Sequence, residues 1–457
     1  MSSTSSLGRV LGLGGSFASL GLAISAVLSL VSTGLVVANT EPTVYGNYAS
    51  ILSTLLLCSF VARFGVDRFA VKSIRAASLS EDKANLDEIT AQMYLSVVLV
   101  GAISSVLAIV SMLLLRSVTS FGPSATDTTL VVVWFTFEAI RPIVMEILRS
   151  RLSLGLATFV GQLGRTSVIF VGVLAVVTFG SLTLTSLLFI GLLSSLLPTL
   201  FGLRGAVANA SDSELPSLRI TLRTLKSSFG TLGFYTLSGT GTLLIASGDI
   251  LVVRSGSASE AAIYGAAVVL SASIGLVMTV VNTTVGPVLQ QVANESTTDV
   301  ANSVLQGITT LATLLAMVAL VTALAVAIFL LPNIGGEIYR EAIGLVSILA
   351  LGQLAGVASG PCGTLLLLLG REKFVGAIIV ATAVLAIGAE VLIFSITGSL
   401  TLVAVVSALA VVIHNFILAA SVKKFLGIST WVLLSPAKTV AAISTIKSQA
   451  GQIALRR

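Results

Sequence analysis

Ionisable side chains are rare inside the long apolar stretches of this sequence, so the few that occur there are the first candidates for chemistry. Glu138 and Arg141 interrupt one stretch and lie three residues apart, which places them on one face of a helix. Gln162 and Arg165 interrupt the next stretch. An arginine fork binds phosphate or carboxylate through two hydrogen bonds, so these residues predict a polar wall that binds an anion. The alternative is a structural ion pair between helices, with Arg165 extending to lipid headgroups.

A second group of polar residues lies in the C-terminal half of the chain. Asp249 and Glu390 are carboxyl groups in separate apolar stretches, and His414 and Asn415 share a third. A carboxyl group in hydrocarbon must be protonated, paired or bound to a cation. Structural interpretations stay open, because Asp249 lies near Arg254 and Glu390 can hydrogen-bond a neighbouring helix. A single histidine such as His414 is more typical of a packing residue than of a ligand.

The composition explains why these charges are unusual. Hydrophobic residues make up 55% of the 457 residues and charged residues only 10%, and the mean hydropathy is +1.07. A soluble domain carries roughly 25% charged residues, so this chain lacks the polar surface that keeps a protein in water. Its apolar runs are about 20 residues long and uninterrupted, which predicts membrane-spanning helices rather than strands.

Apolar runs between polar breaks predict twelve membrane-spanning helices. Their approximate ranges are 14–37, 45–65, 91–115, 128–148, 156–178, 182–202, 230–253, 262–287, 304–331, 342–369, 374–396 and 399–422. The fourth range is the least typical, because it contains Glu138, Arg141 and Glu146. The expected fold class is therefore an all-α polytopic membrane protein.

The positive charges predict how these helices are oriented, because cytoplasmic loops carry an excess of Lys and Arg. With twelve spans, both termini lie on one side of the membrane. Placing them in the cytoplasm puts twenty Lys and Arg residues inside and three outside, with Arg141 and Arg165 at membrane depth. We therefore expect a multi-pass protein of the cell (inner) membrane with both termini in the cytoplasm.

A short repeat divides the chain into two halves. The segment Glu41-Pro42-Thr43-Val44-Tyr45-Gly46 is echoed 219 residues later by Glu260-Ala261-Ala262-Ile263-Tyr264-Gly265. Each copy follows an odd-numbered span and precedes the next one. This spacing predicts two six-helix bundles related by a pseudo-two-fold axis along the membrane normal, with a cavity between them. The alternative is an interfacial Tyr-Gly anchor that recurs by chance.

The repeat and the spans together predict three parts of the chain. Residues 1–215 form an N-terminal six-helix bundle, residues 216–425 a C-terminal six-helix bundle, and residues 426–457 a cytoplasmic tail. In the tail, Ser435-Pro436 is typical of a helix start. Apolar residues then recur at helical spacing opposite lysines, which predicts a basic amphipathic helix on the cytoplasmic leaflet. The alternative is a disordered tail.

Short motifs spread over residues 10–428 resemble those of a known family. They are Tyr45-Gly46-Asn47-Tyr48, Phe64-Gly65-Val66-Asp67-Arg68, Gly248-Asp249, Tyr264-Gly265, Gly336-Glu337-Ile338-Tyr339, Gly370-Arg371-Glu372 and Lys424-Phe425-Leu426-Gly427-Ile428. In order and spacing they resemble the multidrug/oligosaccharidyl-lipid/polysaccharide (MOP) exporter superfamily, and within it the Wzx-type polysaccharide-biosynthesis flippases. The resemblance implies a MATE-like fold. The chain departs from relatives with charges in the first span, since none lies between Val10 and Asn39.

The resemblance also implies a function for the first group of polar residues. Such a flippase moves a polyprenyl-pyrophosphate-linked oligosaccharide from the cytoplasmic to the outer leaflet during polysaccharide biosynthesis (O-antigen, lipopolysaccharide, capsule or exopolysaccharide). Glu138, Arg141, Gln162 and Arg165 would then line the substrate cavity, with the arginines binding the pyrophosphate or an acidic sugar. The expected partners are membrane lipids, the lipid-linked oligosaccharide and other glycan-assembly proteins.

The second group of polar residues fits ion coupling under the same resemblance. Some members of the superfamily bind a sodium ion or protons, so Asp249 and Glu390, with His414 and Asn415 nearby, are the candidates for a coupling-cation site. No other cofactor is expected.

Two alternative functions remain open. One is a cation-coupled multidrug or small-molecule exporter of the same superfamily, although Arg141 and Arg165 favour an anionic substrate. The other is a membrane glycan polymerase or ligase, which the short outer loops and the lack of an outer histidine disfavour. No Walker, HExxH or nucleophile-elbow motif is present, so we expect no enzyme and no catalytic residue.

Metal and nucleic-acid binding are disfavoured by the same sequence. Cys58 and Cys362 lie in separate apolar segments, which excludes a cysteine framework for a disulfide or a zinc ion. The net charge of +6 comes from cations scattered between spans, so a nucleic-acid-binding patch is not expected.

Overall fold

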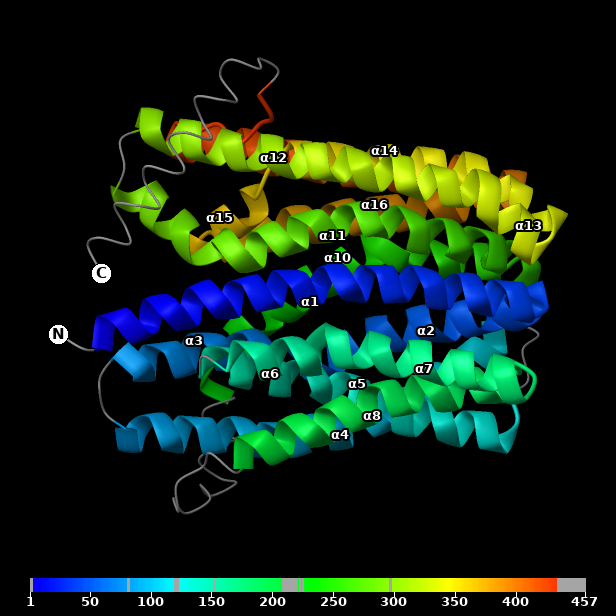
Figure 1. The fold of residues 1–457 in the computed structure, drawn as a ribbon, viewed down its shortest axis with the longest axis horizontal. Coiled ribbons are helices and arrows are strands. Elements are labelled where there is room, and N and C mark those ends of the chain that lie inside the picture. The colour runs from blue at the N-terminus through cyan, green and yellow to red at the C-terminus, as the bar shows by residue number, and fades with distance from the viewer. Residues whose placement is uncertain are drawn as a thin grey trace. The chain divides into compact units, whose positions relative to one another are not determined.

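The protein, seen in a computed structural model, is built from long helices joined by short connections (Figure 1). The structure describes residues 3–79, 83–118, 123–151, 153–207, 221, 223, 226–295 and 298–433, and no β-strand occurs in these ranges. Eleven helices of this part of the chain are long and apolar enough to cross a membrane. The expected all-α polytopic fold class is confirmed.

Two compact units divide the chain. The N-terminal unit comprises Leu20–Leu243 and Val253–Ala262, and the C-terminal unit comprises Met1–Ser19, Leu244–Val252 and Ile263–Arg457. Three helices therefore contribute residues to both units: α1 (Ser3–Asn39), α10 (Phe229–Arg254) and α11 (Ala258–Glu295). The boundary expected after residue 215 stays a prediction.

In the N-terminal unit, helix α5 lies at the centre. The helices in chain order are α1 (Ser3–Asn39), α2 (Pro42–Arg63), α3 (Val66–Leu79), α4 (Lys83–Val118), α5 (Ala125–Ser150), α6 (Leu154–Thr158), the π-helical turn η1 (Phe159–Leu163), α7 (Gly164–Phe179), α8 (Leu184–Val207) and α10 (Phe229–Arg254). α5 packs against α2, α3, α4 and α8 (Figure 1). Its side chains Trp134, Ile143 and Ile147 are fully buried in the core of this unit.

The start of α5 is fixed by local chemistry. Ser124 and Asp127 form a capping box, in which each side chain accepts a hydrogen bond from the backbone of the other. The hydroxyl of Thr185, at the start of α8, donates to Asp127 over 2.7 Å, which sets α8 beside α5. The predicted fourth span is thus a helix of 26 residues, although its charged residues leave it outside the eleven apolar candidates.

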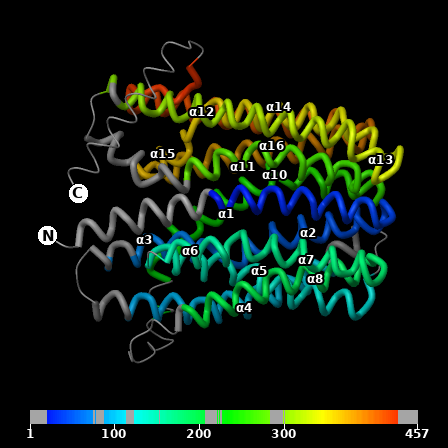
Figure 2. Tube along the Cα trace, viewed as in Figure 1, coloured from blue at the N-terminus to red at the C-terminus, as the bar shows by residue number. Residues whose placement is uncertain are grey.

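In the C-terminal unit, helix α17 is the central element. The helices are α11 (Ala258–Glu295), α12 (Thr298–Ala325), the π-helical turn η2 (Val326–Leu330), α13 (Leu331–Gly335), the 3-10 helix η3 (Glu337–Glu341), α14 (Ala342–Ala358), α15 (Cys362–Leu368), α16 (Glu372–Thr397) and α17 (Leu400–Leu426). α17 packs against α14, α15 and α16. α12 lies beside α14 (Figure 2).

The tenth predicted span differs from the structure. One continuous helix was expected over 342–369, but α14 ends at Ala358 and α15 begins at Cys362. Gly360 between them has φ +81°, a conformation that favours glycine, and Pro361 has no N–H to continue the helix. The apolar run is continuous in sequence, so only these two residues signal the break.

Two further features were not predicted. Helix α3 (Val66–Leu79) follows α2 after a turn in which Phe64 and Gly65 both have positive φ. The range 156–178 contains η1, a turn of π-helix. The amphipathic helix expected from Ser435 onward lies outside the described residues.

The two Tyr-Gly repeats occupy equivalent positions. Each lies within the first two turns of a helix, Tyr45 in α2 and Tyr264 in α11, and both rings are buried. Gly46 lies directly against the backbone of Ala258, so that a Cβ atom there would overlap the Ala258 carbonyl. Gly46 therefore permits close packing between the starts of the two helices that carry the repeat.

Candidate functional site

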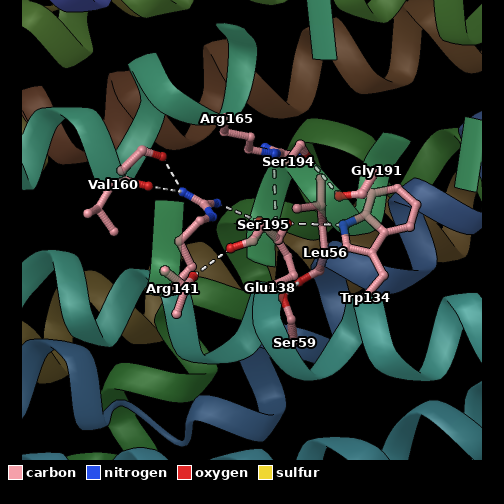
Figure 3. Close-up of polar contacts among 12 residues, drawn as sticks. Leu56, Ser59, Trp134, Glu138, Arg141, Val160, Arg165, Gly191, Ser194 and Ser195 are labelled. Atoms are coloured by element: carbon pink, nitrogen blue, oxygen red, sulfur yellow. Dashed lines mark hydrogen bonds and ion pairs between the residues drawn. The ribbon is translucent and has the colours of Figure 1, made fainter. Parts of the chain in front are cut away.

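The first candidate site is built on one face of α5. Trp134, Glu138 and Arg141 lie one turn apart from each other, and all three are buried. Glu138 is 2% exposed and Arg141 is 6% exposed. Arg141 Nη2 donates to Glu138 Oε1 over 2.6 Å, which is a charge-assisted hydrogen bond (Figure 3). The pairing expected from their spacing is therefore present.

Helix α8 supplies the next residue of this network. Ser195 Oγ donates to Glu138 Oε2 over 2.5 Å and accepts from Trp134 Nε1 over 3.1 Å. Tyr48 of α2 stacks on the Trp134 ring, with 6.1 Å between centroids. Gly191, one turn before Ser195, makes room for the indole, because a Cβ atom there would lie 2.6 Å from it. Three helices thus fix the position of the Glu138 carboxylate.

The guanidinium of Arg141 extends in the other direction, to η1. Arg141 Nη1 donates to the carbonyl oxygens of Val160 and Gly161 (Figure 3). A π-helical turn shifts the backbone hydrogen bonds from i+4 to i+5, and this is the turn that meets the arginine. Gly161 also lies against Met145, whose sulfur occupies the space a Cβ atom would need.

Arg165 completes the network from α7. Its Nε lies 3.8 Å from Glu138 Oε2, and its side chain is 16% exposed. Among the described residues, Arg165 Nε has no hydrogen-bond partner, and neither does Arg141 Nε. One carboxylate therefore faces two guanidinium groups. The network that these residues form, Trp134, Glu138, Arg141, Arg165 and Ser195, is called the arginine network below.

Gln162 does not join the arginine network within the part of the chain that the structure describes. It lies in η1 beside Gly161 and is half-buried, and its backbone carbonyl accepts from Thr166.

A separate ion pair occurs at the end of α2, where Arg63 Nη1 lies 3.2 Å from Asp67 Oδ2 and the Arg63 guanidinium lies over the Phe60 ring. This ion pair was not predicted from the sequence, in which Asp67 is part of the motif Phe64–Arg68.

The second candidate site lies in the C-terminal unit, around Asp249 of α10. Asp249 is 2% exposed, and its Oδ2 accepts from Tyr264 of α11 and Ser407 of α17, each over 2.9 Å. Its Oδ1 accepts from the N–H of Ile250. Sequence reasoning did not identify Ser407, because a serine in an apolar helix carries no distinguishing signal.

Glu390 of α16 lies near this carboxylate. It is 2% exposed, and its Oε2 has no hydrogen-bond partner among the described residues. Helix α16 packs against α10 here, since a Cβ atom on Gly248, next to Asp249, would lie 2.7 Å from the Ile387 side chain, three residues before Glu390. Within the described ranges, no Lys or Arg forms an ion pair with either residue. We call Asp249, Tyr264, Glu390 and Ser407 the acid pair site.

His414 and Asn415 lie two turns further along α17, and their hydrogen bonds are local. His414 Nδ1 is 2.9 Å from the Ala410 carbonyl, and its Nε2 is 3.1 Å from Asn415 Nδ2. Asn415 Nδ2 also donates to the Val411 carbonyl. The predicted place of His414 and Asn415 near a coupling-cation site stays a prediction. No group of three or more His, Cys, Asp or Glu residues able to hold a metal ion occurs in the described part of the chain.

Comparison with known proteins identifies the fold. No protein-family model and no curated protein matches the sequence. Solved structures do match: an inward-facing multidrug resistance MATE family transporter of the MOP superfamily has a TM-score of 0.64 and 13% identity over 90% of this chain and 98% of its own. The lipid II flippase MurJ, in an inward closed conformation, has a TM-score of 0.65 and 15% identity over 89% and 87%.

A third match is the MATE multidrug transporter DinF-BH, with a TM-score of 0.60 and 14% identity over 91% of this chain and 95% of its own. These three proteins share the polytopic helical architecture along nearly the whole chain. Identities this low establish the fold alone. The chain therefore has a MATE-like fold, as the resemblance of its short motifs implied.

Proposed function

We propose that this protein is a membrane transporter that flips a polyprenyl-pyrophosphate-linked oligosaccharide from the cytoplasmic to the outer leaflet. The oligosaccharide serves the biosynthesis of a surface polysaccharide such as O-antigen, capsule or exopolysaccharide. The protein then lies in the inner membrane, with both termini in the cytoplasm as the distribution of Lys and Arg favours.

The observation that carries this proposal is the unequal charge of the arginine network. Arg141 and Arg165 both lie within reach of Glu138, which is the one carboxylate they share. A charge at membrane depth costs about 3 kcal/mol or more, so a buried positive charge without a counter-ion favours an anionic ligand. A pyrophosphate supplies several acceptor oxygens for the planar guanidinium groups.

Glu138 acts as the internal counter-ion in this proposal. Without substrate it pairs with Arg141 and holds Arg165 at 3.8 Å. An arriving pyrophosphate competes for the same donors, beginning with the Arg165 guanidinium, whose Nε–H has no acceptor. Its polyprenyl chain remains in the bilayer, because burying each CH₂ in water-free surroundings is favourable by about 0.8 kcal/mol.

The acid pair site supports a coupling cation for this transport. Two buried carboxyl groups without a basic partner are stable only when protonated or bound to a cation. Asp249 and Glu390 would therefore bind Na⁺ or H⁺, with Ser407 adding an oxygen ligand for Na⁺.

A second candidate function, a cation-coupled exporter of drugs or other small molecules, is favoured by the same acid pair. MATE transporters, whose fold this chain shares, are described as multidrug transporters. The two functions differ in the role of the arginine network. An exporter of organic cations gains nothing from buried guanidinium groups, whereas a flippase for a pyrophosphate depends on them. A glycan polymerase or ligase is the least supported alternative, since the similar solved structures are those of transporters and a flippase.

One experiment separates these functions. Cells lacking the gene should accumulate the lipid-linked oligosaccharide on the cytoplasmic leaflet, and the wild-type gene should restore outward delivery. Arg165→Gln should reduce delivery by about tenfold or more, because it removes the charge-assisted hydrogen bond that Arg165 would donate to the pyrophosphate. Arg149→Gln is the matched control, since Arg149 pairs with Glu146 and lies outside the network.

Normal outward delivery in the deleted strain would contradict the flippase. In proteoliposomes, efflux of a cationic dye that needs an ion gradient and survives Arg165→Gln would establish the exporter instead.

A further inference from the structure

The C-terminal unit contains a short segment whose hydrogen bonds converge on the break between α14 and α15. The segment is Gly427–Leu433, which follows α17 and is called the strap here. The break is Ser359–Pro361, between the end of α14 at Ala358 and the start of α15 at Cys362. The strap is the red end of the described chain and lies next to α12 (Figure 1).

A helix end leaves backbone carbonyls without intrahelical partners. At this break, the strap donates hydrogen bonds to the carbonyls of Ala358 and Ser359. The N–H of Val432 donates to the Ala358 carbonyl over 3.1 Å, and the hydroxyl of Thr430 donates to the Ser359 carbonyl over 2.7 Å. Thr430 is fully buried, so water does not replace its hydroxyl.

The break is shaped to receive the strap. Gly360 has φ +81°, and a Cβ atom there would lie 2.5 Å from the Thr430 carbonyl oxygen and 2.5 Å from the Thr309 hydroxyl. Any side chain at this position would therefore separate the strap from the break. Gly360 is therefore needed both for the positive φ of the turn and for the close approach of the strap.

Helix α12 binds the strap from the other side. Asn302 Oδ1 accepts from the N–H of Ser429 over 2.6 Å, and Thr310 Oγ1 accepts from the N–H of Leu433 over 2.9 Å. These two side chains are spaced two turns apart on α12. Their side-chain oxygens accept hydrogen bonds from backbone N–H groups of the strap, which has no regular secondary structure to pair these groups internally.

Apolar contacts complete the docking. Ile428 is buried in the same core cluster as Leu365 and Leu418. The Trp431 ring packs against Phe416 of α17, with 5.6 Å between centroids. The strap thus contacts α12, the break and α17 together. Displacing it would break all of these contacts.

We propose that the strap is a conformational latch, which holds α14 and α15 in their bent arrangement and must loosen for these helices to move during transport. This inference rests on the proposed transporter function, because a latch on a helix break matters only if the helices move. A buried carbonyl that loses its partner is costly, so the bent arrangement and the docked strap stabilise each other.

The chain carries its own reporter for this latch. Cys362 is buried at the first position of α15, and its thiol donates to the Asn415 carbonyl over 3.8 Å. In a Cys58→Ala background, the rate at which a maleimide modifies Cys362 measures how often the break opens. This labelling requires no substrate, so it is independent of what the protein transports.

The test is Thr430→Val, which keeps the shape of the side chain and removes its hydroxyl. Cys362 labelling should become about five to thirty times faster, the change that one or two kcal/mol brings to an equilibrium. Ser429→Ala is the matched control, because it keeps the backbone N–H that Asn302 accepts. Transport by Thr430→Val should rise severalfold at unchanged apparent substrate affinity, because the latch then loosens more readily.

A second variant keeps the test decisive if Thr430→Val does not fold. Asn302→Ala acts on α12 instead of the strap and should also accelerate labelling. Folded variants with wild-type labelling would overturn the latch. Faster labelling with unchanged transport would show that the strap closes the break without governing the cycle, which also contradicts the proposal. Failure of every transport assay, with faster labelling, would instead contradict the proposed function alone.

Discussion

The two units of this protein bury carboxyl groups in opposite electrostatic surroundings. In the arginine network, Glu138 faces two guanidinium groups, at 2.6 Å and 3.8 Å. In the acid pair site, the hydrogen bonds that Asp249 accepts from the described residues come from the neutral Tyr264 and Ser407 and from a backbone N–H. Glu390 adds a second carboxyl instead of a cation.

The difference indicates different roles. A buried carboxylate that is paired with arginine costs little to keep ionised, and removing it leaves the partner charge uncompensated. A buried carboxyl without a basic partner is a site that a proton or metal cation can neutralise. The arginine network therefore has more basic than acidic groups, whereas the acid pair site has two acidic groups and no basic one.

The largest effect should come from removing the carboxylate that is paired. Glu138→Gln keeps an acceptor for Ser195 but leaves two buried guanidinium groups without a counter-ion. We expect a loss of about 3–5 kcal/mol in the free energy of unfolding, measured by denaturant unfolding in detergent micelles. Asp249→Asn, the matched change in the acid pair site, should cost about 1 kcal/mol or less, because it removes an unpaired charge. Equal losses in the two variants would remove the contrast between the sites.

The next effect should come from adding a cation. If the acid pair site binds Na⁺, replacing choline chloride by sodium chloride at a hundred times Kd should raise the stability by about 2.7 kcal/mol. Asp249→Asn should abolish this gain, whereas Arg149→Gln should keep it. A gain that comes from lowering the pH, and not from Na⁺, would identify the proton as the coupling ion. A protein indifferent to both would contradict cation binding at Asp249.

The sequence predicts most of the helices, because each membrane-spanning helix needs a long apolar run and polar residues end it. The last predicted span, 399–422, corresponds to α17 at Leu400–Leu426. Helix α3 was missed because it is amphipathic and shorter than a span. The break at Gly360 was missed because 342–369 was predicted as one apolar run, although Gly360 and Pro361 signal a break, and the contact with Thr430 that also requires the glycine is a tertiary one.

The candidate sites could be predicted only in part, for a related reason. Spacing within one helix places Arg141 beside Glu138, since residues three apart share a face. Nothing in the sequence brings Arg165, from another helix, to the same carboxylate. Ser195 and Ser407 carry no charge, so each is indistinguishable from the many serines of the spans until the helices are packed.

The smallest effect compares these two serines. Ser195 both donates to Glu138 and accepts from the buried Trp134 indole, so Ser195→Ala leaves two polar groups with one partner fewer and should cost about 1–3 kcal/mol. Ser407→Ala should cost only about 1 kcal/mol, because Asp249 keeps the hydrogen bonds from Tyr264 and Ile250. Denaturant unfolding of both variants in detergent micelles measures the difference.

A double-mutant cycle then assigns the cost of Ser195→Ala to its partner. Combining it with Glu138→Gln should give a coupling energy of about 0.5 kcal/mol or more, as for residues in direct contact. Combining it with Arg149→Gln should be additive, since Arg149 pairs with Glu146 outside the network. An additive result for Ser195 with Glu138 would mean that the serine supports only the Trp134 indole, and that the carboxylate is positioned by its arginines alone.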